Sequence, residues 1–117
     1  MPLRDIVDRF TKSVEEQDRE ALTAFCEHLG VTSMARIVPR TPVRLGGEVR
    51  SVRIVPRAGA PALEVVIADG RGQATAVFLG RRKIGGMSPG RRLVVEGVAA
   101  RSDNRIMLVN PTYVLLP

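Results

Sequence analysis

The sequence has very few of the side chains that most catalytic sites use. Its 117 residues include one cysteine, Cys26, and one histidine, His28. A disulfide within one chain and a cysteine-rich zinc site are therefore excluded, and neither residue has a nearby catalytic partner. Cys26 lies in an apolar helical pattern and is expected to be a small buried hydrophobe. We expect no catalytic residue, no metal, no cofactor and no enzymatic activity.

Long apolar runs are missing as well. No stretch is long enough to span a bilayer, and the N-terminal residues mix charges with apolar positions, unlike a secretory signal. The helical pattern near the N-terminus is acidic, which does not suit attraction to an anionic lipid surface. We therefore expect a cytoplasmic protein that has no membrane partner.

Aromatic side chains are scarce, because the chain has three phenylalanines, one tyrosine and no tryptophan. Proteins that bind single strands tightly stack several bases on such rings. Two of the four rings, Phe10 and Phe25, fall in the helical pattern, which leaves Phe78 and Tyr113 elsewhere. A nucleic-acid binder with so few rings would depend mainly on phosphate contacts. Its affinity would be modest and sensitive to salt.

Positive charge is abundant and unevenly placed. Residues 1–30 carry four basic and seven acidic residues, whereas residues 31–117 carry fourteen basic and five acidic ones. Sixteen of the eighteen basic residues are arginine, which pairs with phosphate better than lysine does. A GC-rich genome would also favour arginine, so the asymmetry between the two parts is the stronger signal. It indicates an acidic arm attached to a basic body.

Residues 1–41 are predicted to form a helical arm and a connector. Apolar residues recur at helical spacing on both sides of a polar patch over 15–20. They are Leu3, Ile6, Val7, Phe10 and Val14, then Leu22, Phe25, Cys26 and Leu29. The pattern favours two short helices, about 3–13 and 18–29, and one bent helix is the alternative. The arm either covers a barrel mouth with Ile6, Phe10, Phe25 and Leu29 or binds a partner, and we expect it to pack on its own barrel or on a second copy.

Residues 42–117 change to the period of two that is typical of strands. The first predicted strand is a long one from Val43 with a bulge or a sharp coil near Gly46-Gly47, and a loop over 56–61 follows it. The other predicted strands are 62–68, 73–79, 91–100 and 105–109, with a continuation after Pro111. Asp69-Gly70-Arg71-Gly72 is a hairpin turn between the second and third strands. The predicted fold class is mainly β with N-terminal helices: a five-stranded OB-fold barrel preceded by one or two short α-helices.

The alternation also predicts which side chains face the interior. In the second strand Leu63, Val65 and Ile67 are expected inside. In the third strand Thr75, Val77 and Leu79 are expected inside, which turns Phe78 outward. A register error of one residue would instead place Phe78 in the core.

Four features carry a resemblance to a known family. They are Gly47, the turn at Asp69–Gly72, Pro89-Gly90, and Pro111-Thr112-Tyr113. Over about residues 43–116 the chain resembles the OB-fold wedge of RecG-type branched-DNA helicases and is similar to anticodon-binding OB domains. As a whole it looks like the small stand-alone OB-fold proteins of high-GC Gram-positive (actinobacterial) bacteria. The phosphate loop of a helicase motor is missing, so the resemblance implies an accessory nucleic-acid binder.

The predicted function is therefore non-enzymatic binding of DNA or RNA, in single-stranded, branched or structured form, through a basic groove. The candidate site residues are Arg50, Arg53, Phe78, Arg81, Arg82, Lys83, Arg101 and Arg105. The cations would neutralise phosphates and Phe78 would stack on a base. The alternative is a protein-interaction or assembly module, in which the barrel and the acidic helices mediate formation of a homo-oligomer or a complex.

Overall fold

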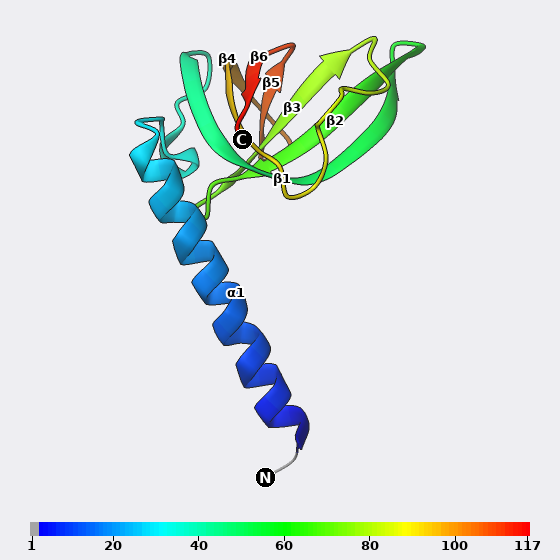
Figure 1. The fold of residues 1–117 in the computed structure, drawn as a ribbon. Coiled ribbons are helices and arrows are strands. Elements are labelled where there is room, and N and C mark those ends of the chain that lie inside the picture. Colours follow the sequence, from blue (N-terminus) through cyan, green and yellow to red (C-terminus); the bar gives the residue numbers. More distant parts are fainter. Residues whose placement is uncertain (1–2) are drawn as a thin grey trace.

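A computed structural model describes residues 3–117, apart from the side chains of residues 3–10 and Lys12. The chain forms one α-helix, a short 3-10 helix and six strands (Figure 1). In chain order they are α1 (Leu3–His28), η1 (Met34–Arg36), β1 (Pro42–Arg57), β2 (Ala60–Ala68), β3 (Gln73–Leu79), β4 (Arg92–Ser102), β5 (Arg105–Val109) and β6 (Thr112–Leu115).

Five strands close into a barrel. The first half of β1 pairs with β4 and its second half with β2, while β3 and β5 pair in parallel and complete the ring β1-β2-β3-β5-β4. The predicted five-stranded barrel is confirmed. The continuation after Pro111 is a separate strand, β6, which pairs with β4 outside the ring. The first hairpin is longer than predicted, because β1 continues to Arg57 and β2 begins at Ala60 where a loop was expected.

The long first strand can serve both halves of the barrel because it contains two adjacent glycines. A Cβ atom on Gly47 would lie 2.5 Å from the carbonyl oxygen of Ala68, so only glycine lets β1 cross the end of β2 this closely. Pairing with β4 runs unbroken through Gly46 and Gly47, so a bulge at these glycines is wrong, while the alternative, a sharp coil of the strand, stays a prediction. The register shift lies between Val49 and Ser51, in the pairing with β2.

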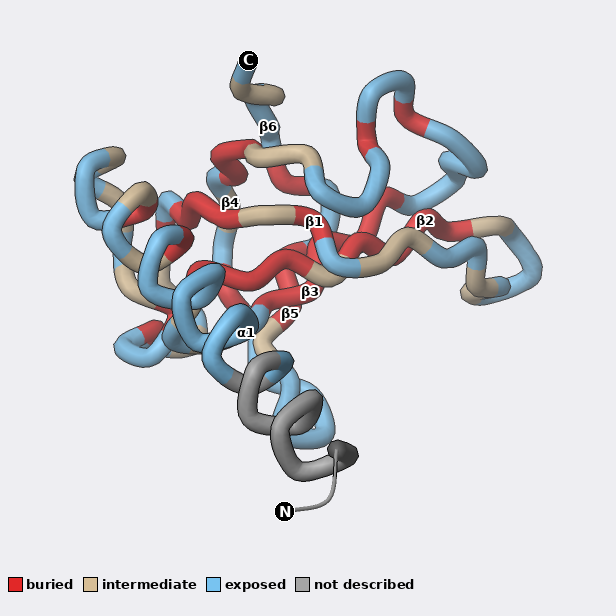
Figure 2. The backbone as a smooth tube through the Cα atoms, turned by 60° about the horizontal axis from the view of Figure 1, so that its bottom comes forward, coloured by how far each residue is buried: buried red, intermediate tan, exposed pale blue. Residues whose placement is uncertain are grey.

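Every strand of the ring contains buried residues (Figure 2). The barrel interior is filled by branched aliphatic side chains from β1, β2, β4 and β5, together with Ala74, Ala76 and Phe78 from β3. The most deeply buried include Leu45, Val49, Leu63, Val65, Ile67, Leu93, Val95 and Leu108. Two segments outside the ring add to this core: Met34 and Ile37 from the connector, and Ile84 and Met87 from the loop between β3 and β4. These four residues, rather than the helical arm, complete the barrel core.

The orientation predicted for β3 is wrong by one residue. The pairing places Leu63 opposite Phe78 and Ile67 opposite Ala74, so Ala74, Ala76 and Phe78 share the interior face with the inward side chains of β2. The ring of Phe78 is only 5% exposed and contacts the ring of Tyr113 edge-on, with centroids 5.6 Å apart. Phe78 is therefore a core residue, and the prediction that it stacks on a base is withdrawn.

The arm is one continuous helix, not two. Among the described side chains of the helix, those of the C-terminal third pack on the barrel: Leu22 and Cys26 are buried, and Phe25 lies under the guanidinium of Arg92 at 4.2 Å. The rest of α1 stands away from the barrel (Figure 1), and the molecule measures 54 × 31 × 31 Å. Of the four residues predicted to cover a barrel mouth, Phe25 contacts the start of β4 and Leu29 lies close to Gly46 of β1. The side chains of Ile6 and Phe10, named in the same prediction, lie outside the described residues.

A buried aspartate, Asp69, holds the turn between β2 and β3 in place. Its Oδ1 accepts hydrogen bonds from the backbone amides of Arg71 and Gly72, each at 2.9 Å, and its Oδ2 accepts one from Met34 at 2.8 Å. The next residue, Gly70, has a φ of +88° and lies so close to α1 that a Cβ atom there would overlap the Thr23 hydroxyl. The Asp69 carboxylate thus joins the hairpin to the connector, and Gly70 places the same turn against the helix.

We predict that Asp69→Asn lowers the free energy of unfolding by about 1–3 kcal/mol, because an amide NH₂ would then face at least one backbone N–H that has lost its acceptor. Asp103→Asn is the matched control, since Asp103 is exposed and its side chain accepts no hydrogen bond from a described residue. It should change the free energy by less than about 0.5 kcal/mol. Urea unfolding measures both, and equal effects would refute the role given to Asp69.

Candidate nucleic-acid interface

Three arginines converge on one buried carboxylate on the outer face of the barrel. Glu64 on β2 is only 3% exposed, and its oxygens lie 3.3 Å from Arg53, 3.3 Å from Arg57 and 4.0 Å from Arg105. Arg53 and Arg57 come from the second half of β1 and Arg105 from the start of β5. We call Arg53, Arg57 and Arg105 the arginine cluster. Together with Glu64 it carries a net charge of about +2.

The strand register explains why these residues meet. Arg53 pairs directly with Glu64, and Arg57 follows Arg53 by four residues on the same face of β1. Beneath them lies a small second core of Ala62, Val77 and Met107, which is buried although it belongs to the outer face. The aliphatic stems of arginine can cover such a floor while their charged ends stay in water.

The arginine cluster keeps most of its hydrogen-bonding capacity free. A guanidinium has five N–H donors, yet Arg53 and Arg57 each donate only one bond to Glu64. The three side chains remain 62%, 37% and 48% exposed, in the order Arg53, Arg57, Arg105. The Nε atom of Arg57 is buried and has no hydrogen-bond partner. Glu64 therefore gathers the guanidinium groups without saturating them, which suits recognition of an external anion such as a phosphate.

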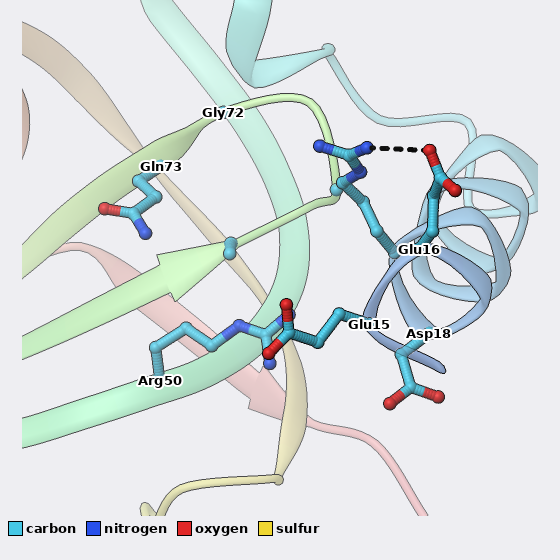
Figure 3. Close-up of a pocket in the computed structure, with 9 residues that line it drawn as sticks. Glu15, Glu16, Asp18, Arg50, Gly72 and Gln73 are labelled. Carbon is cyan, nitrogen blue, oxygen red and sulfur yellow. Dashed lines mark ion pairs between the residues drawn. The ribbon is translucent and has the colours of Figure 1, made fainter. Parts of the chain in front are cut away.

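Arg50, a predicted site residue, lies elsewhere. It forms an ion pair with Glu48 at 3.2 Å and lines a cleft of about 720 Å³ between α1 and the β2–β3 turn. Figure 3 shows its guanidinium directed toward Glu15, with Glu16 and Asp18 on the same helix. The three carboxylates make this cleft unsuitable for a polyanion. Arg50 pairs with Glu48 and not with Glu64, so it does not belong to the arginine cluster.

Arg81, Arg82 and Lys83 are exposed in the loop that follows β3. The loop leaves the sheet beside the β1–β2 hairpin, because the amide of Gly80 donates to the carbonyl of Pro61 at 2.8 Å. In the part of the chain that the structure describes, none of the three side chains forms an ion pair. They form a second group of cations that begins at the end of the sheet where Arg57 lies.

Arg101 is exposed but belongs to the other face of its strand. It pairs with Ile106, whose side chain packs on the barrel core, whereas Arg105 pairs with Ser102 on the outer face. The predicted site residues therefore divide into three sets. Arg53 and Arg105 meet, the 81–83 loop begins near the same hairpin, and Arg50, Arg101 and Phe78 lie apart from the arginine cluster.

Two residues of this interface were missed by the sequence analysis. Arg57 was assigned to a loop, although it follows Arg53 by an even number of residues and would share its face if the strand continued. Glu64 is not among the candidate site residues, because its three partners lie 7, 11 and 41 residues away in the chain. The first omission had a local signal, while the second needed the barrel topology.

Comparison with known proteins supports the fold. Among solved structures, the chain is similar to a chain of the Replication Protein A heterotrimer bound to single-stranded DNA, with a TM-score of 0.51 and 14% sequence identity. The match covers 76% of this chain and 74% of that one. No protein-family model and no curated protein matches the sequence. With the closed ring of five strands, the similarity establishes an OB-fold barrel preceded by one helix.

Two further features do not occur among the described residues of the chain. None of its helices has an apolar stretch sufficient to traverse a lipid bilayer, within the described residues. Over the same part of the chain, histidine, cysteine and acidic side chains form no group of three or more that could hold a metal ion.

Cys26 has the environment of a structural thiol. It is buried against β1, where its Sγ lies 3.6 Å from the carbonyl oxygen of Gly46. Burial and, to a smaller extent, the negative charge of Asp69 together raise the pKa of this thiol from 9.0 to about 11. The reactive thiolate is therefore rare at neutral pH.

We predict that Cys26 in the folded protein reacts with iodoacetamide at pH 8 about 100-fold more slowly than in the unfolded chain, because the thiolate is that much rarer. Since the folded pKa is the higher one, this thiol contributes stability below pH 9.0 that is lost as the pH rises toward 11. Unfolding curves across this range should show the loss, and Cys26→Ser should lack it. Equal labelling rates in the two states would contradict this description.

Proposed function

We propose that this protein is a non-enzymatic OB-fold module that binds nucleic acid through its arginine cluster, mainly by contacts to phosphates. The observation that carries the proposal is the convergence of three exposed guanidinium groups on the buried Glu64. Their spacing is held by the barrel, so little side-chain order has to be gained on binding. The loop cations Arg81, Arg82 and Lys83 would extend the contact along the backbone of the ligand.

The chemistry of the face favours phosphates over bases. Its floor is aliphatic, and among the described side chains no aromatic ring lies on it, since Phe78 is buried in the barrel. Without stacking platforms, binding would be of modest affinity, tolerant of sequence and weakened by salt. The resemblance to a helicase wedge favours branched or structured DNA or RNA as the ligand, alongside single strands.

We predict that removing the bases from a single-stranded oligonucleotide changes the affinity by less than about threefold. Stacking contributes about 1–3 kcal/mol per base where it occurs, so even one stacked base would cost about 5- to 150-fold. Fluorescence anisotropy with oligothymidylate and with an abasic strand of equal length measures the difference. A loss of fivefold or more would show that bases are contacted and would overturn the phosphate-only description.

A second prediction locates the site. The variant Arg53→Gln, Arg57→Gln, Arg105→Gln and Glu64→Gln removes the arginine cluster without leaving a buried charge unpaired. We expect it to reduce the slope of log K against log salt by about 2, since each phosphate contact to a single strand contributes about 0.7. Circular dichroism and the melting temperature confirm that the variant is folded.

The matched control is Arg36→Gln with Arg44→Gln, which lowers the net charge by the same two units at exposed positions outside the cluster. It should leave the slope nearly unchanged. Equal effects of the two variants would mean that binding follows net charge alone. No binding of the unaltered protein to single-stranded, duplex or forked DNA or RNA at low salt would defeat the proposed function itself.

Assembly is a second candidate function, and α1 is the observation that favours it. A helix that packs only its C-terminal third on its own domain gains little stability from tertiary contacts elsewhere. A partner chain would supply those contacts. The OB-fold hosts both roles, and one protein can combine them.

A further inference from the structure

The helix α1 has a second side-chain stripe that the barrel does not use. Counting from Val14, the positions 14, 17, 21, 24 and 28 follow the alternating spacing of three and four residues that marks a coiled-coil seam. All five are exposed, with Val14 at 39%. Their mean direction lies about 140° around the helix from that of the barrel-facing Leu22 and Cys26. Packing on the barrel therefore leaves this stripe open.

The same spacing continues toward the N-terminus through Phe10, Val7 and Leu3. Because α1 is helical from Leu3 to His28, these positions fall on the same side of the helix. We call the stripe of residues 3, 7, 10, 14, 17, 21, 24 and 28 the seam. It runs the length of the helix, whereas the contact with the barrel occupies only the C-terminal third.

We propose that α1 pairs with α1 of a second copy of this chain, in antiparallel orientation along the seam. The inference goes beyond nucleic-acid binding and does not depend on it. A sustained alternation of three and four residues is the pattern by which two helices bury side chains against each other. A single helix in water gains nothing from it, so the seam points to a helical partner.

The sizes of the seam residues indicate the orientation. The N-terminal half of the seam offers large apolar residues, Leu3, Val7 and Phe10, while the C-terminal half offers Gln17 and two alanines. An antiparallel pair that centres between positions 10 and 14 sets Leu3 opposite Ala21, Val7 opposite Gln17 and Phe10 opposite Val14, so no two of the three large apolar residues face each other. A parallel pair would instead stack large against large at one end and leave two alanine layers at the other.

Charge gives the same orientation. Residues 3–12 carry three basic and two acidic residues, whereas residues 13–28 carry one basic and five acidic ones. A parallel pair would bring the two acidic halves together over their whole length. An antiparallel pair sets each acidic half beside the more basic half of its partner, which lowers the repulsion. The resulting dimer has twofold symmetry and carries its two barrels at opposite ends.

The first test is the mass of the intact protein in solution, by light scattering over a range of chain concentrations. We expect twice the chain mass of 12.7 kDa. Val14→Glu places a charge in the middle of the seam and should weaken dimerisation by about 100-fold or more, while the helix remains anchored through Leu22. Arg19→Gln is the control, since it makes the same change in net charge at an exposed position off the seam.

A protein that stays monomeric at millimolar concentration would overturn the proposal. So would a dimer that Val14→Glu leaves intact, because the contact would then lie elsewhere. Circular dichroism and the melting temperature of the variant show that the barrel is still folded, so a fall from dimer mass to monomer mass does not come from unfolding. Because the readout is mass, failure of this proposal is distinguishable from failure of nucleic-acid binding.

The second test fixes the orientation by disulfide cross-linking, which requires Cα atoms closer than about 7 Å. Chains with Val7→Cys and chains with Gln17→Cys are oxidised separately and as a mixture; the native Cys26 is buried and does not compete. An antiparallel seam brings position 7 of one chain to position 17 of the other, so only the mixture should cross-link. Efficient cross-linking of either variant alone would overturn the antiparallel arrangement.

Discussion

The carboxylate of Asp69 is the constraint on which the rest of the structure depends. By accepting three backbone hydrogen bonds, it sets a four-residue turn, and the turn sets the register between β2 and β3. That register decides that Phe78 enters the barrel and that Glu64 leaves it. The same side chain fixes the connector at Met34 and thereby the point at which α1 meets the barrel. Both the position of the arginine cluster and the direction of the arm follow from one buried polar group.

Much of the fold could be predicted from the sequence, because the strand boundaries follow glycine, proline and aspartate residues with known turn preferences. The face of β3 could not, since residues 74–78 are all buried and alternation vanishes when both faces of a strand are covered. The turn length held the answer, because a four-residue turn pairs Ile67 with Ala74 and so places both inside. The two-helix interpretation of the arm failed for a related reason. Polar residues over 15–20 indicate a helix leaving the barrel surface as readily as a helix that ends.

The candidate site was less predictable than the fold. Alternation placed Arg53 and Arg105 on a strand face, but Glu64, which gathers them, looked isolated because barrel closure brings its partners from two distant strands. A lone glutamate in an apolar strand is costly to bury unless cations surround it. Its position within a chain rich in arginine was therefore a usable signal. A buried glutamate on a face rich in arginine therefore identifies the point at which the arginine side chains converge.

The edge-on contact between Phe78 and Tyr113 has an optical consequence. Tyr113 is the only tyrosine, and the chain contains no tryptophan, so the tyrosine bands of ultraviolet emission and near-ultraviolet dichroism, which differ from the weaker phenylalanine bands, arise from one phenol ring. That ring sits where β6 meets the interior of the barrel, away from the arm. Its spectrum thus reports on the contact between β6 and the barrel interior. Changes in the helix alter this spectrum only if they reach that contact. The protein carries its own site-specific chromophore.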